Sequence, residues 1–218
     1  MTKTFVQLVK QHFEYLVLKY NFDLLVSTES PRGHPWEGRV EYVTKLTFID
    51  IDCTRGESPM IHVSRMKDLK RYPVSLDTIY EYHNLSEEEK EIIVTRTPDK
   101  EFQRKASEIL YSKRLSRCVL ISTNETDEKK MDFELSLNAK HLFQYAEPFL
   151  RGDFSRWLEI YEYQVGKMWA EIFRSGKSEF VLYRAGSDAR GKPVYEKRLV
   201  FQDSIDYLES LKEEYRKK

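Results

Sequence analysis

The spacing of apolar side chains changes within residues 38–82 from every second position to every third or fourth. The first part has the period of half-buried strands, with polar residues between Val40 and Tyr42, Leu46 and Phe48, and Ile49 and Ile51. The shift of phase at Phe48 and Ile49 predicts a bulge or a strand end. After Ser75, a suitable N-cap, the spacing becomes helical at Leu76, Ile79, Tyr80 and His83. The segment therefore predicts an α+β fold, with antiparallel sheet flanked by helices.

The N-terminal pattern completes this first sheet. An apolar stripe between Phe5 and Tyr20 predicts one amphipathic helix that ends at Asn21. A strand is expected over 22–27, and the glycines and prolines of 30–38 predict a loop. A tight connection at 54–57 precedes a further strand beginning at Met60. Together these signals predict a four-stranded meander.

The middle of the chain predicts two helices and a hairpin. Ser86 and Glu89 form a capping-box pattern, and a second helix is expected over about 99–116. A strand is expected at 118–122. Strict alternation then predicts another strand after a turn at 123–130, with Met131, Phe133, Leu135 and Leu137 on one side.

The C-terminal third carries the clearest helical stripe of the chain. Its apolar side chains are expected to be core, namely Phe154, Trp157, Leu158, Tyr161, Val165, Met168, Trp169, Ile172 and Phe173. A hairpin is predicted from strands at 180–183 and 194–201, before a terminal helix capped by Asp203 or Ser204. We expect one α+β domain over 1–218. The alternative is a division near 98–117, with a helix and meander in 1–97 and a helix-rich part with one or two hairpins in 98–218.

Composition narrows the class of protein. The 36 basic and 36 acidic residues give a formal net charge of zero, so no overall field attracts nucleic acid or anionic lipid. The chain has two cysteines, Cys53 and Cys118, and no signal-peptide pattern, which favours a cytoplasmic protein with reduced thiols. No apolar run approaches the roughly 20 residues that span a bilayer, so no membrane insertion is expected.

Carboxylates along one predicted strand are the strongest candidates for metal chemistry. Asp50 and Asp52 project from one face, and Glu57 and His62 lie across the expected turn. Such a set suits a divalent metal in a hydrolase or nuclease. The same alternation is typical of a half-solvated strand. No lysine stands beside Glu57, where Ser58 and Pro59 follow, so the sequence assigns no metal ligand.

Other catalytic patterns are missing from the sequence. No serine lies in a Gly-x-Ser-x-Gly context, and neither cysteine has a local catalytic signature. The histidines do not pair at metal-ligand spacing; they are His12, His34, His62, His83 and His141. His12 lies on an apolar stripe and is expected to be a partly buried side chain bonded to a backbone carbonyl. We therefore expect a protein that is not an enzyme, with no catalytic or cofactor-binding residues and no cofactor.

Three basic clusters leave a nucleic-acid alternative open. They are Arg65, Lys67, Lys70 and Arg71; Lys113, Arg114 and Arg117; and Arg190, Lys192, Lys197 and Arg198. Joined in one groove with Tyr72 or Tyr195, they would bind a phosphate backbone and stack bases. The equal number of acidic residues favours solvated surface, so a nucleic-acid partner is not the expected one.

A succession of short segments lies within about the first 155 residues, namely 20–24, 40–42, 54–57, 64–68, 72–76, 145–146 and 150–153. This succession resembles a class of small bacterial cytosolic proteins, many of them uncharacterised. Some of that class look like immunity proteins that sit beside secreted toxins. Beyond Trp157 the chain departs from the pattern. The resemblance implies a protein that works by binding, without catalytic residues.

These observations together predict a non-catalytic, cytoplasmic, protein-binding α+β protein. Its expected action is the occlusion of a protein partner, as an immunity-type inhibitor acts. Tyrosine and arginine are the residue types favoured in such interfaces, and the chain has 14 tyrosines. The metal-dependent hydrolase with Asp50, Asp52 and Glu57, and the nucleic-acid-binding protein with the basic clusters, remain the alternatives.

Overall fold

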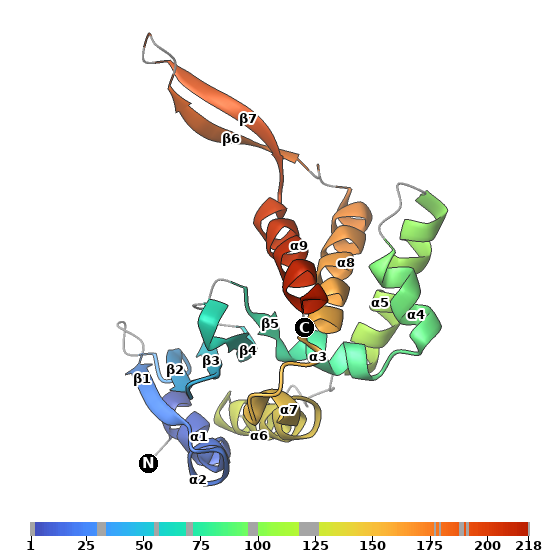
Figure 1. Cartoon of the computed structure of the whole chain (residues 1–218). Coiled ribbons are helices and arrows are strands. Elements are labelled where there is room, and N and C mark those ends of the chain that lie inside the picture. Colours follow the sequence, from blue (N-terminus) through green and yellow to red (C-terminus); the bar gives the residue numbers. More distant parts are fainter. Residues whose placement is uncertain are drawn as a thin grey trace. The chain divides into compact units, whose positions relative to one another are not determined.

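The protein is described by a computed structural model that forms two compact units (Figure 1). The first unit contains residues 1–84 and 118–157, and the second contains residues 85–117 and 158–218. The structure describes residues 3–29, 34–54, 57–68, 72–95, 100–117, 127–176, 178, 180–187, 190 and 192–217. Among these residues no helix has both the length and the apolar character that a bilayer crossing requires.

A five-stranded antiparallel sheet forms the centre of the first unit (Figure 1). Its strands follow one another in chain order: β1 (Asp23–Glu29), β2 (Gly38–Val43), β3 (Thr47–Cys53), β4 (Met60–Arg65) and β5 (Val74–Ser75). The turn between β2 and β3 is closed by Thr44, whose hydroxyl accepts the backbone N–H of Thr47 at 2.9 Å. The α+β class and the antiparallel meander are confirmed, with β5 as one additional short strand.

The bulge or strand end expected at Phe48 is wrong. β3 runs without a register shift against both β2 and β4. Phe48 and Ile49 are both buried although they point to opposite faces, so the apolar phase changes while the strand continues. The irregularity lies in β1 instead, between Leu24 and Val26.

The expected N-terminal helix is broken into α1 (Phe5–His12) and α2 (Glu14–Tyr20). Thr4 caps α1 in a reciprocal capping box with Gln7. Phe13 leaves helical geometry, with φ −106° and ψ 13°, and its ring is fully buried. Asn21, in the left-handed conformation at φ 56°, ends α2 as expected.

The helix that follows the sheet confirms its predicted cap. After the 3-10 helix η1 (Met66–Asp68), Ser75 begins α3 (Leu76–His83), and its hydroxyl accepts the N–H of Thr78 at 3.1 Å. This side chain satisfies one backbone donor that the first helical turn leaves without a partner.

The strand expected at Met131–Leu137 is wrong, because these residues belong to α6 (Asp127–Tyr145). Its buried positions recur at helical spacing: Met131, Leu135, Asn138, Ala139 and Leu142. Phe133 is 46% exposed, so its alternation with Met131 does not mark one buried face. Residues 127–130 are therefore helix instead of turn, and 118–126 lie outside the described residues. The short helix α7 (Glu147–Leu150) follows α6.

The second unit contains helices and one hairpin. The helices are α4 (Glu87–Val94), α5 (Lys100–Arg117), α8 (Trp157–Ser175) and α9 (Gln202–Arg216), and the strands are β6 (Phe180–Ser187) and β7 (Pro193–Leu199). α8 begins at the last residue of the first unit. The Ser86 and Glu89 capping box of α4 is present, whereas α9 begins after Phe201 without the expected side-chain cap.

The aromatic stripe of α8 is only partly core. Trp157, Tyr161 and Val165 are buried, while Leu158, Trp169 and Ile172 are half-buried. Edge-to-face contacts join α8 to α9 and to Phe201, the residue before it. The ring centroids of Tyr161 and Tyr207 are 4.8 Å apart, and those of Trp169 and Phe201 are 5.0 Å apart. The helical spacing alone therefore did not predict that some residues of the stripe are partly exposed to solvent.

Candidate functional site

A polar cluster lies on one face of the central sheet, where β3 meets β4. Asp50 stands directly opposite His62 in the antiparallel register, and Asp52 stands opposite Met60. Side chains two residues apart on a strand share a face, so both aspartates and His62 project to the same side. The neighbouring residues along the strands, Ile49, Ile51 and Ile61, point to the other side and are buried.

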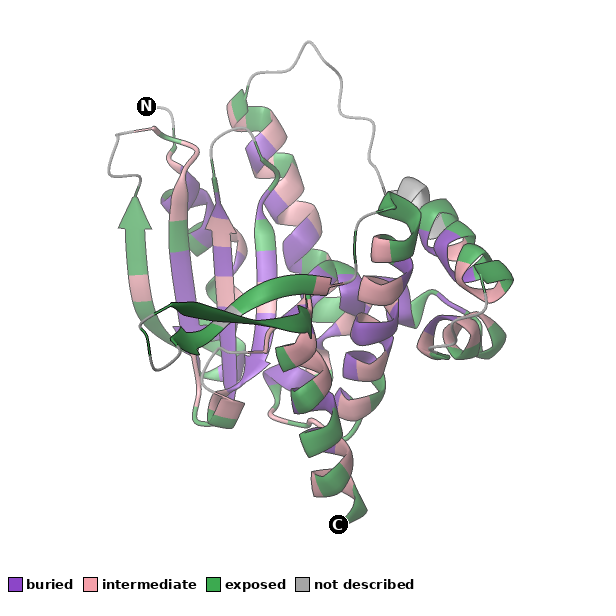
Figure 2. Cartoon of the chain, turned by 90° about the horizontal axis from the view of Figure 1, so that it is seen from above, coloured by how far each residue is buried: buried purple, intermediate pink, exposed green. Residues whose placement is uncertain are grey.

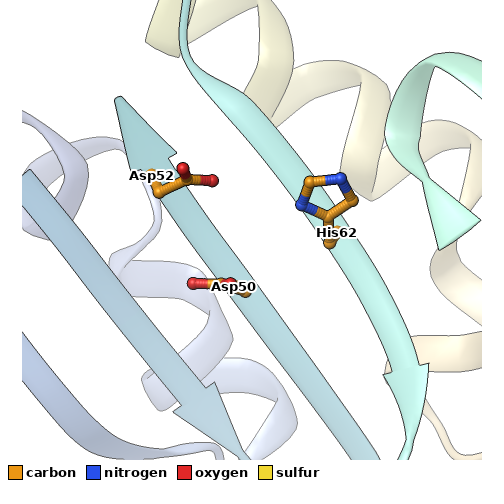
Figure 3. Close-up of side chains that lie close together, drawn as sticks. All are labelled: Asp50, Asp52 and His62. Carbon is orange, nitrogen blue, oxygen red and sulfur yellow. The ribbon is translucent and has the colours of Figure 1, made fainter. Parts of the chain in front are cut away.

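The three side chains are grouped closely enough to coordinate one ion. One ligand atom from each of Asp50, Asp52 and His62 lies within 4.8 Å of the other two, and all three residues are half-buried. Figure 3 shows the carboxylate of Asp52 turned toward the His62 ring across the gap between the strands. Two carboxylate groups and one imidazole are donors that divalent transition metals accept.

Arg39, on β2, fixes the position of Asp50. Its Nε donates to Asp50 Oδ1 at 2.8 Å and its second guanidinium nitrogen donates to Oδ2 at 2.6 Å. The same Nε lies 3.1 Å from Glu41, whose side chain is 5% exposed. These carboxylates raise the pKa of Arg39, chiefly through the hydrogen bonds to Asp50. Sequence analysis did not single out Arg39, because strand pairing alone brings it opposite Asp52.

The electrostatic surroundings of Asp52 differ from those of Asp50. Burial is the main cause that raises the pKa of Asp52 above its ordinary value, and the neighbouring Asp50 adds to it. His62 and Arg39 act in the opposite direction. The side chains of Asp52 and His62 make no hydrogen bond or ion pair within the described residues. Their ligand atoms are therefore available to a further partner.

Glu57 is not brought into this cluster. Its carboxylate bonds to the Thr54 hydroxyl and lines a cavity of about 450 Å³ in the first unit. The other residues around this cavity are His34, Trp36, Cys53, Ser58, Asp127, Lys130, Met131 and Glu134. Burial also raises the pKa of Glu134, and a hydrogen bond with Ser58 acts in the opposite direction. The four residues considered for a metal thus divide between a sheet face and a separate cavity.

The thiol at this cavity is expected to be chemically inert at neutral pH. Burial raises the pKa of Cys53 from its ordinary 9.0 to about 12, and Sγ lies 3.3 Å from the carbonyl oxygen of Glu57. At pH 8 in a Cys118→Ser chain, we expect modification by a disulfide reagent at least about 100-fold slower in the folded protein than in urea. Equal rates would contradict the burial.

The raised pKa of Cys53 also makes the free energy of unfolding depend on pH. The folded state holds the Cys53 proton more tightly than the unfolded state, so below about pH 9 this group has no effect. Between about pH 9 and 12 the unfolded thiol ionises first, and the free energy of unfolding is expected to fall.

The remaining histidines have contacts that need no ligand. His12 is partly buried as predicted, but the backbone carbonyl expected as its partner is wrong, because Nε2 lies 2.8 Å from the carboxylate of Asp132. His141 stacks on Tyr80 at 4.8 Å, and His83 lies 5.9 Å from Tyr145. His34 lines the cavity.

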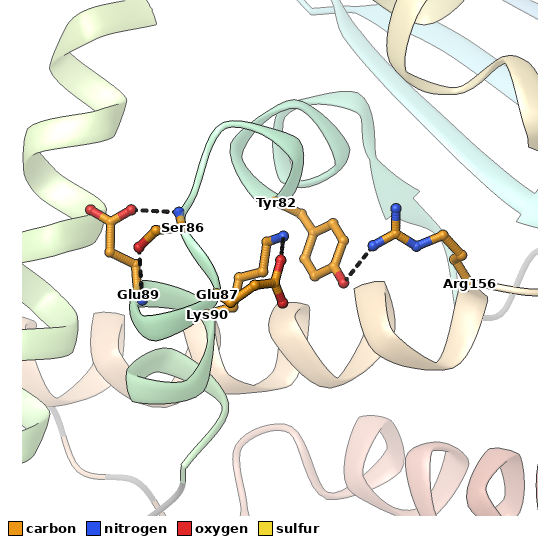
Figure 4. A network of polar contacts seen from close by, with 6 residues as sticks. All are labelled: Tyr82, Ser86, Glu87, Glu89, Lys90 and Arg156. Carbon is orange, nitrogen blue, oxygen red and sulfur yellow. Dashed lines mark hydrogen bonds and ion pairs between the residues drawn. The ribbon is translucent and has the colours of Figure 1, made fainter.

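Polar contacts at two helices also have local roles. In the first unit Arg156 donates to the hydroxyl of Tyr82 at 3.2 Å (Figure 4). In the second unit Ser86 and Glu89 cap α4, and Lys90 pairs with Glu87 at 2.6 Å. Such contacts stabilise helix ends and require no ligand.

The three basic clusters belong to different elements, namely β4 with η1 in the first unit, and α5 and hairpin β6–β7 in the second. Arg65 is buried and pairs with Asp68 at 2.6 Å, while Lys70 and Arg71 lie outside the described residues. The backbone of residues 113–117 forms the end of α5, and the side chains of these residues lie outside the described part of the structure. Lys197 and Arg198 belong to β7, where they contact the rings of Phe180 and Tyr183.

Hairpin β6–β7 is unusually exposed to solvent. Six of the seven residues of β7 are exposed, and in β6 Val181, Leu182 and Tyr183 are 47%, 73% and 54% exposed (Figure 2). The two strands pair with each other and with no further strand in the described part of the chain. Sequence analysis predicted the hairpin and did not predict its exposure.

No protein-family model matches the chain, and no match was found among curated proteins or solved structures.

Proposed function

We propose that the protein is a non-catalytic binding protein that binds a protein partner through hairpin β6–β7. The observation that carries the proposal is the exposure of large apolar side chains on both faces of this hairpin. Val181, Leu182, Tyr183, Val194 and Tyr195 are each between 43% and 73% exposed. Clustered apolar surface of this kind is typical of an interaction site.

The antiparallel register gives the hairpin two distinct faces. One face carries Phe180 and Leu182 opposite Leu199 and Lys197, and the other carries Val181 and Tyr183 opposite Arg198 and Glu196. On each face a cation covers an aromatic ring, with Lys197 Nζ 4.0 Å from the Phe180 centroid and the Arg198 guanidinium 4.7 Å from that of Tyr183. Aromatic and arginine side chains arranged together are common at interface hot spots.

A two-stranded hairpin has little stability by itself in water. It needs further strands or a packed face, and within the described residues β6 and β7 have no third strand. A partner that covers the apolar side chains would supply the missing burial. Binding would therefore stabilise the hairpin as well as the complex.

The chemistry of the hairpin favours an acidic protein surface as the partner. Residues 180–199 contain five basic and two acidic side chains, a net charge of +3 in a chain whose total is zero. Opposite charge on a partner would steer its approach. Exposed Leu182 and Val194 offer aliphatic contacts of the kind that protein interfaces bury, and Glu196 beside Arg198 would repel phosphate. These observations favour protein over nucleic acid.

The mechanism that follows is occlusion. A hairpin bound across a partner's surface would cover that surface without any chemical step. This is the mode of action that the resemblance to immunity proteins implies.

The test compares two equally exposed leucines. A photo-crosslinking amino acid is placed at Leu182 of the hairpin or at Leu18 of α2, each of which is 73% exposed. In the source cells, position 182 is expected to crosslink one protein with an acidic surface, and position 18 is not. With that protein purified, Leu182→Asp should weaken binding at least about tenfold in calorimetry. Leu18→Asp should leave the Kd within about twofold.

Three results would overturn the proposal. They are a nuclease-sensitive crosslink at position 182, a crosslink there only to a second copy of the chain, and a purified partner that binds Leu182→Asp as tightly as the unchanged protein. Circular dichroism of both leucine variants shows whether each has kept its fold.

A further inference from the structure

We propose that Asp50, Asp52 and His62 form a binding site for one divalent transition-metal ion, such as Zn²⁺ or Mn²⁺. The site lies on the face of the first unit's sheet at β3 and β4. It does not depend on the proposed function of hairpin β6–β7, which belongs to the other unit.

The first support is distance. Ligand atoms bound to Zn²⁺ lie about 2.0–2.2 Å from the ion in tetrahedral geometry, so two of them are about 3.5 Å apart. The three donors lie within 4.8 Å of one another, which is near this spacing.

The second support is the rigidity of the strands that carry the donors. Both β3 and β4 are interior strands of the five-stranded sheet, and Asp50 is paired directly with His62. Ligands held on regular elements keep their relative positions better than ligands on loops. Arg39 further fixes the Asp50 carboxylate from the β2 side. A carboxylate has about four lone-pair directions, so two bonds to Arg39 leave room for a metal.

The third support is that several polar side chains at this face have no partner in the described part of the chain. The side chains of Asp52 and His62 make no hydrogen bond or ion pair there. Ser64 lies two positions beyond His62 on β4, and its side chain therefore projects from the same face. Its hydroxyl is buried, with the residue 1% exposed, and has no hydrogen-bond partner among the described residues. The polar side chains of this face thus have bonding capacity that the described residues leave unused.

The donor set also indicates the kind of metal. Mg²⁺ and Ca²⁺ prefer oxygen donors alone, whereas an imidazole nitrogen suits zinc, manganese and iron. Two aspartates and one histidine therefore favour a transition metal. Three protein ligands leave the remaining coordination positions to water.

Calorimetry on the full chain, first treated with a chelator, tests the site with Zn²⁺ and Mn²⁺. We expect one ion per chain, and binding of Mg²⁺ and Ca²⁺ at least about tenfold weaker. Asp52→Asn and His62→Gln should each reduce Zn²⁺ affinity at least about tenfold. His12→Gln is the matched control, because His12 also lies beside an aspartate, 2.8 Å from Asp132, and is outside the cluster.

Binding should also raise the melting temperature of the unchanged protein and of His12→Gln, since the ion binds the folded state. The two cluster variants should lose this increase, and their circular dichroism without metal tests that they are folded. The proposal is overturned if millimolar Zn²⁺ and Mn²⁺ show no saturable binding to the unchanged chain. It is also overturned if folded Asp52→Asn and His62→Gln bind Zn²⁺ as the unchanged chain does.

Discussion

Replacement of Trp157 by alanine is expected to lower the free energy of unfolding by about 3–5 kcal/mol. The side chain is fully buried, and its ring makes edge-to-face contacts with Phe149 and Phe154 at centroid distances of 5.4 and 5.3 Å. Truncation removes this apolar contact area and leaves a cavity that neighbouring rings fill only in part. Chemical denaturation followed by circular dichroism measures the loss.

Leu18→Ala provides the control for this prediction. Leu18 is 73% exposed, so its truncation should change the free energy of unfolding by no more than about 0.5 kcal/mol. Trp169→Ala should cost less than Trp157→Ala, because Trp169 is only half-buried. A loss below about 1 kcal/mol for Trp157→Ala would contradict the packing described for this part of the first unit.

Gly166→Ala is expected to destabilise the second unit by about 2–3 kcal/mol, although alanine is normally the better helix former. A Cβ at Gly166, in α8, would lie 2.2 Å from the carbonyl oxygen of Ile93 and 3.2 Å from the Cα of Val94. Both are backbone atoms, which cannot move aside by a rotamer change. The helices α4 and α8 would have to separate. The measurement is the free energy of unfolding in urea.

Gly176→Ala is the matched substitution without a steric neighbour. Nothing lies within 4 Å of a Cβ at Gly176, and its φ of +63° gives only the conformational cost of a left-handed residue. That cost is about 1–2 kcal/mol. If Gly166→Ala instead stabilises the protein, the close approach of α4 and α8 is wrong.

Local signals in the sequence were sufficient for several elements. Ser75 and Ser86 satisfy backbone donors within three residues of themselves, so their helices could be predicted without knowledge of the rest of the chain. Strands β2 to β4 were likewise predicted, because burial of one sheet face imposes a period of two on a short segment.

Segments whose local pattern fits two structures were decided by packing. Alternation over Met131–Leu137 fits a strand, yet Met131, Leu135 and Leu142 are buried together as one face of α6. Phe13 interrupts the N-terminal helix although it continues the apolar spacing, and its ring is fully buried. Tertiary burial outweighs propensities of a few tenths of a kcal/mol per residue.

The candidate sites divide in the same way. The sequence by itself determined that Asp50 and Asp52 share a face, since this follows from the geometry of any strand. Only the tertiary structure decided that His62 stands opposite Asp50, that Arg39 holds Asp50, and that Glu57 lies at a different cavity. It also decided that hairpin β6–β7 exposes its apolar side chains. Strand register and solvent exposure depend on contacts between residues distant in sequence, whereas side-chain alternation depends on the backbone of one strand alone.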